Sequence, residues 1–359
     1  MKSTVKKLVS TFWLISCFFI ISSSLQPAAA QAKAEGDYLE RKELIALLDE
    51  LEKEFQFNRN EIETLFSDVK RKDSIIKAMN RPAEGKPWKE YRPIFITSKR
   101  IKKGVAFWEK NLETLKRAEA TFGVPAEIIV AIIGVETFYG HNKGSYRVID
   151  ALATLGFDYP KRSKFFSNEL KNFVVLSREA GLDPAKVKGS YAGAMGYPQF
   201  IPTSYRHYAV DFDDDGITDL IDNPVDAIGS VGSYFKAHGW QTDGPVVFPA
   251  TVNKDIYDDS VTTLGLKPSF TLTELSKKGL SFKDSNLNID LEQKATALKY
   301  QGKKGEELWL GLKNFYVITR YNHSALYAMA VFQLSEAIKE KMSGQQVART
   351  VNKEVTTNK

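Results

Sequence analysis

The segment from Phe122 to Gly140, FGVPAEIIVAIIGVETFYG, constrains the fold more than any other part of the chain. Pro125 suits the first position of a helix, because the N–H group that proline lacks would have no partner there. A stripe at spacings of i, i+3, i+4 and i+7 then follows on one helical face, formed by Ile129, Ile132, Ile133 and Glu136. The sequence therefore predicts a buried helix whose apolar stripe ends in a carboxyl group.

The position of Glu136 allows two interpretations. In the first, an amphipathic helix simply reaches solvent in its last turn. In the second, Glu136 is a catalytic acid, because a carboxyl group held against apolar side chains has a raised pKa and can carry a proton near neutral pH. Phe138, Tyr139 and Gly140 are typical of a cleft wall but do not decide between the two.

The first thirty residues have the layout of a secretory signal. Three lysines precede an apolar run, Leu8–Ile21, and small residues around Ala30 follow it. The run is too short to favour a membrane-spanning helix. We therefore expect cleavage near Ala30 or Ala32, a signal peptide at residues 1–30 and a periplasmic protein.

The only cysteine, Cys17, lies inside this signal. Residues 14–17 read LISC and could be a lipoprotein cleavage box, but the apolar run continues past the cysteine, where a polar mature start would be expected. Lipid anchoring at Cys17 is therefore the less favoured alternative. A mature chain without cysteine forms no disulfide, so it relies on its core or on a metal for stability.

The whole chain has a formal net charge of +6, of which three charges are signal lysines, which leaves +3 for the mature protein. This balance is compatible with an anionic wall or membrane surface. It is too small to indicate nucleic-acid binding.

Helical spacing dominates the mature chain, and strands are expected only near its end. We expect three short helices within 36–80 and further helices at 101–122, 151–156, 161–180, 204–210, 224–238, 273–278 and 325–342. Strands are expected at 246–252, 308–312 and 315–318, a loop at 81–91, and a frayed, disordered tail at 343–359. The predicted fold class is α+β, mainly α.

The segment Asp211–Asp222, DFDDDGITDLID, has the pattern of a calcium-binding EF-hand loop. Acidic residues occupy positions one, three, five, nine and twelve, and Gly216 at position six permits the sharp turn. The expected ligands are the carboxylates of Asp211, Asp213, Asp215 and Asp222 and the carbonyl of Ile217.

Asp222 departs from this pattern, because a bidentate glutamate is usual at position twelve. The alternative is a solvated acidic turn without metal. A single loop of this kind favours a structural Ca²⁺ over a calcium sensor, and no organic cofactor is expected.

Several common chemistries find no support in the sequence, which contains no G-x-S-x-G, no H-E-x-x-H and no histidines at ligand spacing. Two stretches, 190–204 and 316–327, instead mix small residues, amides and aromatic rings. This mixture suits a saccharide groove, because sugars offer hydroxyls to amides and apolar faces to rings. Turn glycines and core aromatics are the alternative explanation.

Five segments together resemble the lytic murein transglycosylases of the membrane-bound lytic transglycosylase B type. They read GVPAEIIVAIIGVETFYG, GSYAGAMGYPQFIPTSY, YAVDFDDDG, DAIGSVGSYFKAHGW and FYVITRYNHS, and they cover most of residues 85–335 in the family's order. The resemblance implies a lysozyme-like core domain, here 119–243, that carries the EF-hand loop. Around it we expect a helical domain at 36–118, completed by 325–342, and a small β-containing domain at 244–324 that returns to the cleft.

The resemblance also implies roles for individual residues. The glutamate of the family's V-E-T motif is the single catalytic acid and base, and it corresponds to Glu136. Groove residues are implied at Ser190 and Gln199 and, less directly, at Tyr91, Tyr234, Tyr321, Asn322 and Tyr327. Pro198 stands where we would expect a glycine, which could stiffen the approach to Gln199.

The reaction implied by the resemblance cleaves the β-1,4 bond between N-acetylmuramic acid and N-acetylglucosamine in peptidoglycan and closes a 1,6-anhydro ring. Glycan strands are then the substrate, wall-synthesis enzymes are candidate partners, and a monomer is expected. Two alternatives stay open: a hydrolytic muramidase of the same fold, and a non-catalytic wall-binding protein that keeps the groove.

Overall fold

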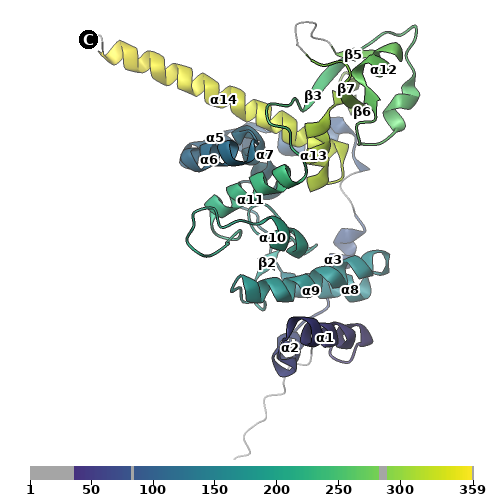
Figure 1. Ribbon diagram of the computed structural model, residues 1–359, viewed down its shortest axis with the longest axis vertical. Helices are drawn as coiled ribbons and strands as arrows, with labels where there is room; N and C mark the ends of the chain where they lie inside the picture. The colour runs from purple at the N-terminus through teal and green to yellow at the C-terminus, as the bar shows by residue number, and fades with distance from the viewer. Residues whose placement is uncertain (1–35, 82–84, 283–288, 358–359) are drawn as a thin grey trace, which may run out of the picture. The chain divides into compact units, whose positions relative to one another are not determined.

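The computed structural model describes residues 36–81, 85–282 and 289–357. The predicted signal peptide and Cys17 lie outside these described residues. Helices dominate the described chain, and a five-stranded sheet is its largest β structure (Figure 1). The predicted fold class, α+β and mainly α, is confirmed.

The segment singled out by the sequence forms helix α7, Ala126–Thr137. Every residue of α7 except Glu136 is buried, so the helix is enclosed on all sides and not only along the expected stripe. Pro125 is the N-cap, with φ −57° and ψ 140°, and does not occupy the first helical position that we predicted. The helices packed around α7 are α5, Ser98–Lys110; α6, Leu112–Phe122; α11, Pro224–Ala237; and α14, Ala325–Thr357 (Figure 1).

Helix α14 runs antiparallel to α7 and is joined to it by a polar contact at each end. Near the start of α7, Glu127 accepts a hydrogen bond from Lys339 at 2.7 Å. Near its end, Glu136 accepts a hydrogen bond from Tyr327 at 2.5 Å. The two contacts fix the register of the helix pair.

The three short helices expected within 36–80 are confirmed. They are α1, Lys42–Phe55; α2, Arg59–Phe66; and α3, Asp73–Met79. Helices α1 and α3 pack on α9, Ser163–Glu179, and α8, Val148–Asp158, respectively. Arg41 and Tyr38 donate to the carboxylate of Asp158 at 2.5 and 2.8 Å, which ties the N-terminal helices to the end of α8.

Two expectations upstream of α7 are wrong. The predicted loop 81–91 contains the start of α4, Trp88–Phe95, with Trp88 and Tyr91 buried. The predicted helix 101–122 is divided at Asn111 into α5 and α6. The side chain of Asn111 is buried and donates to the carbonyl of Phe107 at 2.8 Å, so it competes with the backbone ladder at the break.

The β structure is an antiparallel sheet with strand order β4-β6-β7-β3-β5. Its strands are β3, Val247–Val252; β4, Phe270–Thr271; β5, Leu280–Phe282; β6, Lys294–Gly302; and β7, Gly305–Gly311. One face packs with helix α12, Leu272–Lys277, and the 3₁₀ turn Asp259–Thr263 around a separate small core that includes Leu275 and Leu310. The strands predicted at 246–252 and 308–312 are confirmed, whereas β4, β5 and β6 were missed.

The strand predicted at 315–318 is wrong, because these residues lie in helix α13, Lys313–Tyr321. Asn314 is fully buried and bonds the backbone of Gln241 and Gly244, which fixes the start of this helix. The disordered tail predicted from 343 is also wrong, since α14 continues to Thr357.

The remaining elements come between α7 and β3 in the sequence. Residues 146–147 (β1) and 188–189 (β2) pair antiparallel, a 3₁₀ turn covers Pro160–Arg162, and α10 covers Pro202–Tyr208. Within the described residues no single helix could cross a membrane. The bent pair α6 and α7, with 112° between the axes, passes that test by length and composition alone, as buried core helices can.

Gly104 of α5 and Gly134 of α7 make room for the side chain of Tyr139. A Cβ added at Gly134 of α7 would lie 2.6 Å from the Tyr139 hydroxyl oxygen and 2.7 Å from its ring. We therefore expect Gly134→Ala to destabilise the protein by about 1–3 kcal/mol, the usual cost of overpacking. Urea denaturation measures this difference.

Gly344 of α14 is the matched control, because a Cβ there meets nothing within 4 Å. Gly344→Ala should leave stability unchanged or raise it by up to about 1 kcal/mol through helix propensity. Equal behaviour of the two variants would contradict the packing described for Tyr139.

Candidate active site and metal loop

Glu136 lies in the last turn of α7, where the buried helix reaches the surface. Its neighbours Phe138, Tyr139 and Gly140 all have positive φ, at 53°, 61° and 84°. A Cβ at Gly140 would come within 2.1 Å of the Tyr197 ring, so only glycine fits this close approach. The chain thus turns sharply after the helix and leaves Glu136 partly exposed.

Burial raises the pKa of the Glu136 carboxyl from its ordinary value of 4.5 to about 7, against the opposing effect of the Tyr327 hydrogen bond. Tyr327 lies in the first turn of α14, is 3% exposed and donates to Oε1 of Glu136. Burial is the main cause that raises the pKa of Tyr327 well above its usual value, and the charge of Glu136 adds to it. The Tyr327 hydroxyl therefore stays protonated and remains a donor. Glu136 can therefore hold or release a proton near neutral pH.

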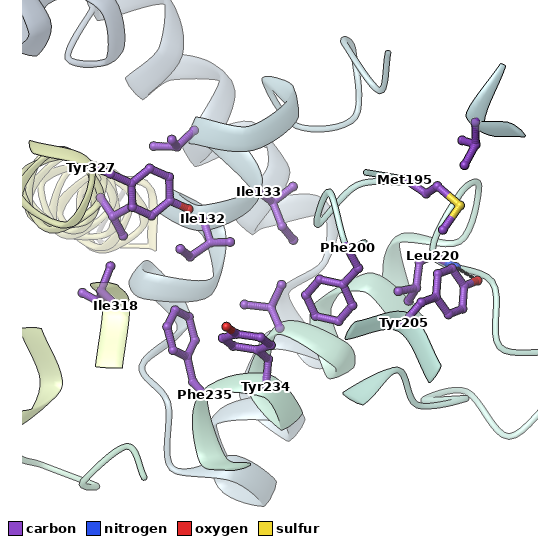
Figure 2. Packing of buried hydrophobic residues seen from close by; sticks show 14 of the residues in the cluster. Ile132, Ile133, Met195, Phe200, Tyr205, Leu220, Tyr234, Phe235, Ile318 and Tyr327 are labelled. Atoms are coloured by element: carbon purple, nitrogen blue, oxygen red, sulfur yellow. Dashed lines mark hydrogen bonds between the residues drawn. The ribbon is translucent and has the colours of Figure 1, made fainter. Parts of the chain in front are cut away.

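Tyr327 belongs to the same buried core as the aromatic rings of Phe200, Tyr234 and Phe235 (Figure 2). The ring of Tyr321 is parallel to that of Tyr327 within 11°, with centroids 6.5 Å apart, and contacts Tyr234 edge-on at 4.8 Å. The hydroxyls of Tyr321 and Tyr234 donate to the backbone carbonyls of Pro198 and Arg320 at 2.5 and 2.6 Å. Both hydroxyls are thus used within the protein; Tyr234 is buried and stacked on His238 at 4.0 Å, whereas Tyr321 is partly exposed.

Tyr91 and Asn322, both expected in the groove, differ in exposure. Tyr91 is buried on α4, where its ring packs between Trp88 and Phe95, and its hydroxyl is close enough to influence Tyr327. Asn322 directly follows Tyr321 at the end of α13 and is exposed. The junction of α13 and α14 thus brings Tyr321 and Tyr327 close to Glu136.

The loop 190–200 lies against the end of α7. The Thr137 hydroxyl is 3.0 Å from the carbonyl of Tyr197, which links the two segments. Gln199 has a φ of 52°, and its side-chain amide donates to the carbonyls of Gly196 and Lys143 at 2.9 and 3.2 Å. Ser190 accepts the N–H groups of Ala192 and Ala194, so its hydroxyl oxygen stabilises the turn.

The acidic loop gathers three carboxylates, but not the expected set. Oxygens of Asp211, Asp213 and Asp226 lie within 4.8 Å of one another, a spacing at which one cation can bind all three. Asp226 is fully buried in the first turn of α11 and accepts the N–H groups of Phe212 and Asp219, each at 2.7 Å. Burial raises the pKa of Asp226, and the charges of Asp213 and Asp211 act in the same direction. A bound cation would relieve this repulsion.

The other two expected carboxylates, those of Asp215 and Asp222, lie outside this cluster. Asp222 accepts a hydrogen bond from the Lys143 ammonium at 2.7 Å and is exposed, and Asp215 accepts the N–H of Ile217 at 2.8 Å. Gly216 has the predicted turn conformation, with a φ of 88°. Sequence reasoning missed Asp226, although an aspartate three residues after the helix-capping Asn223 was a usable signal.

Lys143 connects the acidic loop to the loop of Gln199. Its ammonium donates to the carbonyl of Ile221 at 2.6 Å as well as to Asp222, and it lies 5.1 Å from the centroid of the Tyr197 ring. Its backbone carbonyl accepts the amide of Gln199. One residue thus contacts both predicted sites.

Comparisons with known proteins find a matching family and several similar proteins. A family model described as transglycosylase SLT domain matches residues 40–336. Membrane-bound lytic murein transglycosylase B of Escherichia coli (strain K12) is 41% identical over 324 residues, which are 88% of this chain and 87% of that protein.

Two solved structures are similar over most of their length. Soluble lytic transglycosylase SltB1 from Pseudomonas aeruginosa has a TM-score of 0.79 and 54% identity, over 83% of this chain and 98% of that chain. Escherichia coli lytic transglycosylase Slt35 in complex with calcium has a TM-score of 0.79 and 41% identity, over 87% of this chain and 97% of that chain.

The hydrogen bond from Tyr327 stabilises the charged form of Glu136. We expect Tyr327→Phe to raise the pKa of Glu136 above its present value of about 7, because burial then acts without the opposing bond. Carboxyl-carbon NMR of Glu136 across a pH titration measures this change.

Tyr321→Phe is the matched control, since the Tyr321 hydroxyl donates to Pro198 and not to Glu136. This variant should shift the pKa of Glu136 less than Tyr327→Phe does. A Tyr327→Phe titration that matches the wild type would show that the bond has no influence on the carboxyl group.

Proposed function

The chain belongs to the transglycosylase SLT domain family and is a lytic murein transglycosylase, and from this premise we propose how its residues cleave peptidoglycan. The observation that carries the proposal is the Glu136 carboxyl, which has a pKa of about 7 and a buried hydroxyl donor at 2.5 Å. Such a group can give up a proton and take one back at neutral pH.

In the first step, Glu136 donates its proton to the glycosidic oxygen of the β-1,4 bond between N-acetylmuramic acid and N-acetylglucosamine. The bond from C1 of the muramic sugar to that oxygen breaks, and the N-acetylglucosamine end leaves as an alcohol. General acid catalysis of this kind contributes about 100- to 10,000-fold in rate. The carboxylate that remains is stabilised by the donor of Tyr327.

In the second step, the Glu136 carboxylate takes the proton of the C6 hydroxyl of the same muramic sugar. The C6 oxygen bonds to C1 and closes the 1,6-anhydro ring, and Glu136 is protonated again. Glycosidases that use water or a covalent intermediate need a second carboxylate. Here the substrate's hydroxyl takes that place, so a single carboxyl group suffices.

We propose that the glycan lies along the side chains that surround Glu136. The partly exposed ring of Tyr321 offers apolar surface to a sugar, Asn322 offers an amide, and Gln199 offers its side-chain oxygen, while the buried Tyr327 acts through its hydroxyl. Tyr234 would position Tyr321 through their edge-on ring contact, and Tyr91 would pack beside Tyr327. Ser190 shapes the loop through its turn bonds.

We propose Ca²⁺ as a structural ion of the acidic loop, with no organic cofactor. Three clustered carboxylates, one of them buried, are the hard oxygen donors that this ion prefers. Asp211, Asp213 and Asp226 would hold it, with Asp215, the Ile217 carbonyl and Asp222 as the remaining ligands expected for an EF-hand loop. The ion supplies charge compensation to the loop and takes no part in bond cleavage.

The relative from Escherichia coli is named as membrane-bound, and we propose an envelope location for this chain. Residues 1–30 would be the export signal and the mature protein a periplasmic monomer, with Cys17 lipidation as the less favoured alternative. The division into a helical domain (36–118), a core (119–243) and a β-containing domain (244–324) stays a prediction, as do wall-synthesis enzymes as partners.

Glu136→Gln keeps the size of the side chain but cannot exchange the proton. Its rate of glycan cleavage should fall at least about 100-fold. Mass spectrometry of digested sacculi measures both rate and product, and the wild type should release muropeptides with a 1,6-anhydro end. Products one water heavier would indicate a hydrolytic muramidase, and intact glycan a wall-binding protein without activity.

Calcium should raise the melting temperature of the protein and chelator should lower it, because an ion bound only by the folded state stabilises that state. Asp226→Asn should abolish this response to calcium, whereas Asp222→Asn should largely keep it. Differential scanning calorimetry with and without calcium compares the two variants. Loss of the calcium response in Asp222→Asn but not in Asp226→Asn would instead indicate Asp222 as a main ligand.

A further inference from the structure

A cavity lies away from Glu136, between α4, the hairpin of β6 and β7, and α14. Its volume is about 590 Å³, and we call it the hairpin cavity. Neither Glu136 nor the aspartates of the acidic loop line it. Ligand pockets in proteins commonly measure about 300–1,000 Å³, so the hairpin cavity can hold a molecule of two sugar rings.

The side chains of β7 alternate between the two faces of the sheet, and those on one face form the first wall of the hairpin cavity. Leu308 and Leu310 face the small core of the sheet, so Glu307 and Trp309 face the other way, towards α4 and α14. Trp309 is only partly buried, although it packs at the edge of the main core. An aromatic ring is therefore open to the cavity.

Helix α14 provides the opposite wall with Phe332 and Gln333, of which Phe332 is also partly buried. Arg92 of α4 donates from Nε to the side-chain oxygen of Gln333 at 2.5 Å. This bond holds two planar polar groups in place across the cavity mouth. It leaves the amide of Gln333 and the guanidinium of Arg92 with further N–H donors.

The turn of the hairpin holds a carboxylate beside these donors. Gly302 and Gly305 pair in register, so Lys303 and Lys304 form the two-residue turn. A Cβ at Gly302 would lie 2.0 Å from an oxygen of Glu307, so the carboxylate rests against this glycine. Glu307 thus places an acceptor on the wall that carries Trp309.

The charges around the cavity nearly cancel. Its lining carries four cationic side chains and three carboxylates, the latter being Glu307, Glu336 and Glu340. A polyanion would meet repulsion from these acids, and a cation would meet the lysines and Arg92. A neutral ligand that offers both donors and acceptors fits the lining better.

We propose that the hairpin cavity is a second glycan-binding site that takes a neutral segment of β-1,4-linked N-acetylhexosamine. Trp309 and Phe332 would stack on the apolar faces of the sugar rings, and Gln333, Arg92 and Glu307 would bond the hydroxyl and acetamido groups. Trp88 lines the cavity and stacks on Tyr91 with centroids 6.4 Å apart, so one aromatic layer separates it from the proposed groove. The choice of glycan rests on the proposed function.

The test uses the full chain with Glu136→Gln, so that ligand is not consumed, and the tetramer of N-acetylglucosamine as the probe. Calorimetry should find two binding events. Trp309→Leu, which keeps an apolar side chain but removes the ring, should weaken one of them about three- to tenfold, the effect of one aromatic contact. Trp309→Phe is the matched control and should retain most of that binding.

Phe332→Leu is a second variant, on the opposite wall of the cavity, and should weaken the same binding event. It separates loss of a ligand contact from a disturbance of the sheet caused by the change at Trp309. In the active enzyme, Trp309→Leu should lower affinity for sacculi while anhydro products from a short soluble glycan form at the wild-type rate. Loss of those products in the unmodified enzyme would refute the proposed function and not this site. Unchanged two-site binding of the tetramer in both variants would overturn the proposal. A hairpin cavity that binds a stem peptide but not the tetramer would overturn it as well.

Discussion

Burial of one carboxyl group at the end of α7 is the constraint on which the rest of the structure depends. Every other residue of that helix is enclosed, so Glu136 is the point at which it meets solvent. A charge here is costly without a donor, and the donor comes from Tyr327, 191 residues further along the chain. The pair forms only if α14 lies in register with α7, and the contact of Lys339 with Glu127 secures the other end of the two helices.

The loops around Glu136 are held by a continuous series of polar contacts. Tyr321 donates to Pro198, the neighbouring Gln199 donates to Lys143, and the Lys143 ammonium reaches the exit of the acidic loop at Asp222. Since these bonds join α13 to the acidic loop, a metal that orders the acidic loop would also steady Gln199. An ion bound there would influence the residues around Glu136 without touching the substrate.

Local patterns were sufficient for α7, for the glycine turn of the acidic loop and for strands β3 and β7, because periodicity and turn residues are properties of short segments. They failed where distant contacts decide. Asn111 breaks a helix that spacing alone would continue, and α13 forms from a segment with strand composition because Asn314 is held by the chain near Gln241. Tyr327 was expected only as a groove residue, from family resemblance, and its bond to Glu136 was not predicted. Asp226 was missed because it lies beyond the twelve-residue pattern.

The most direct test of this account compares the free energy of unfolding of the wild type and Glu136→Gln from about pH 4 to about pH 8. The pKa of Glu136 is about 7 in the folded protein and near 4.5 when exposed, so the folded wild type resists ionisation over that interval. The glutamine variant should therefore gain stability relative to the wild type as the pH rises, by about 2–3 kcal/mol at pH 8. A stability difference that does not change with pH would contradict a buried, proton-bearing Glu136.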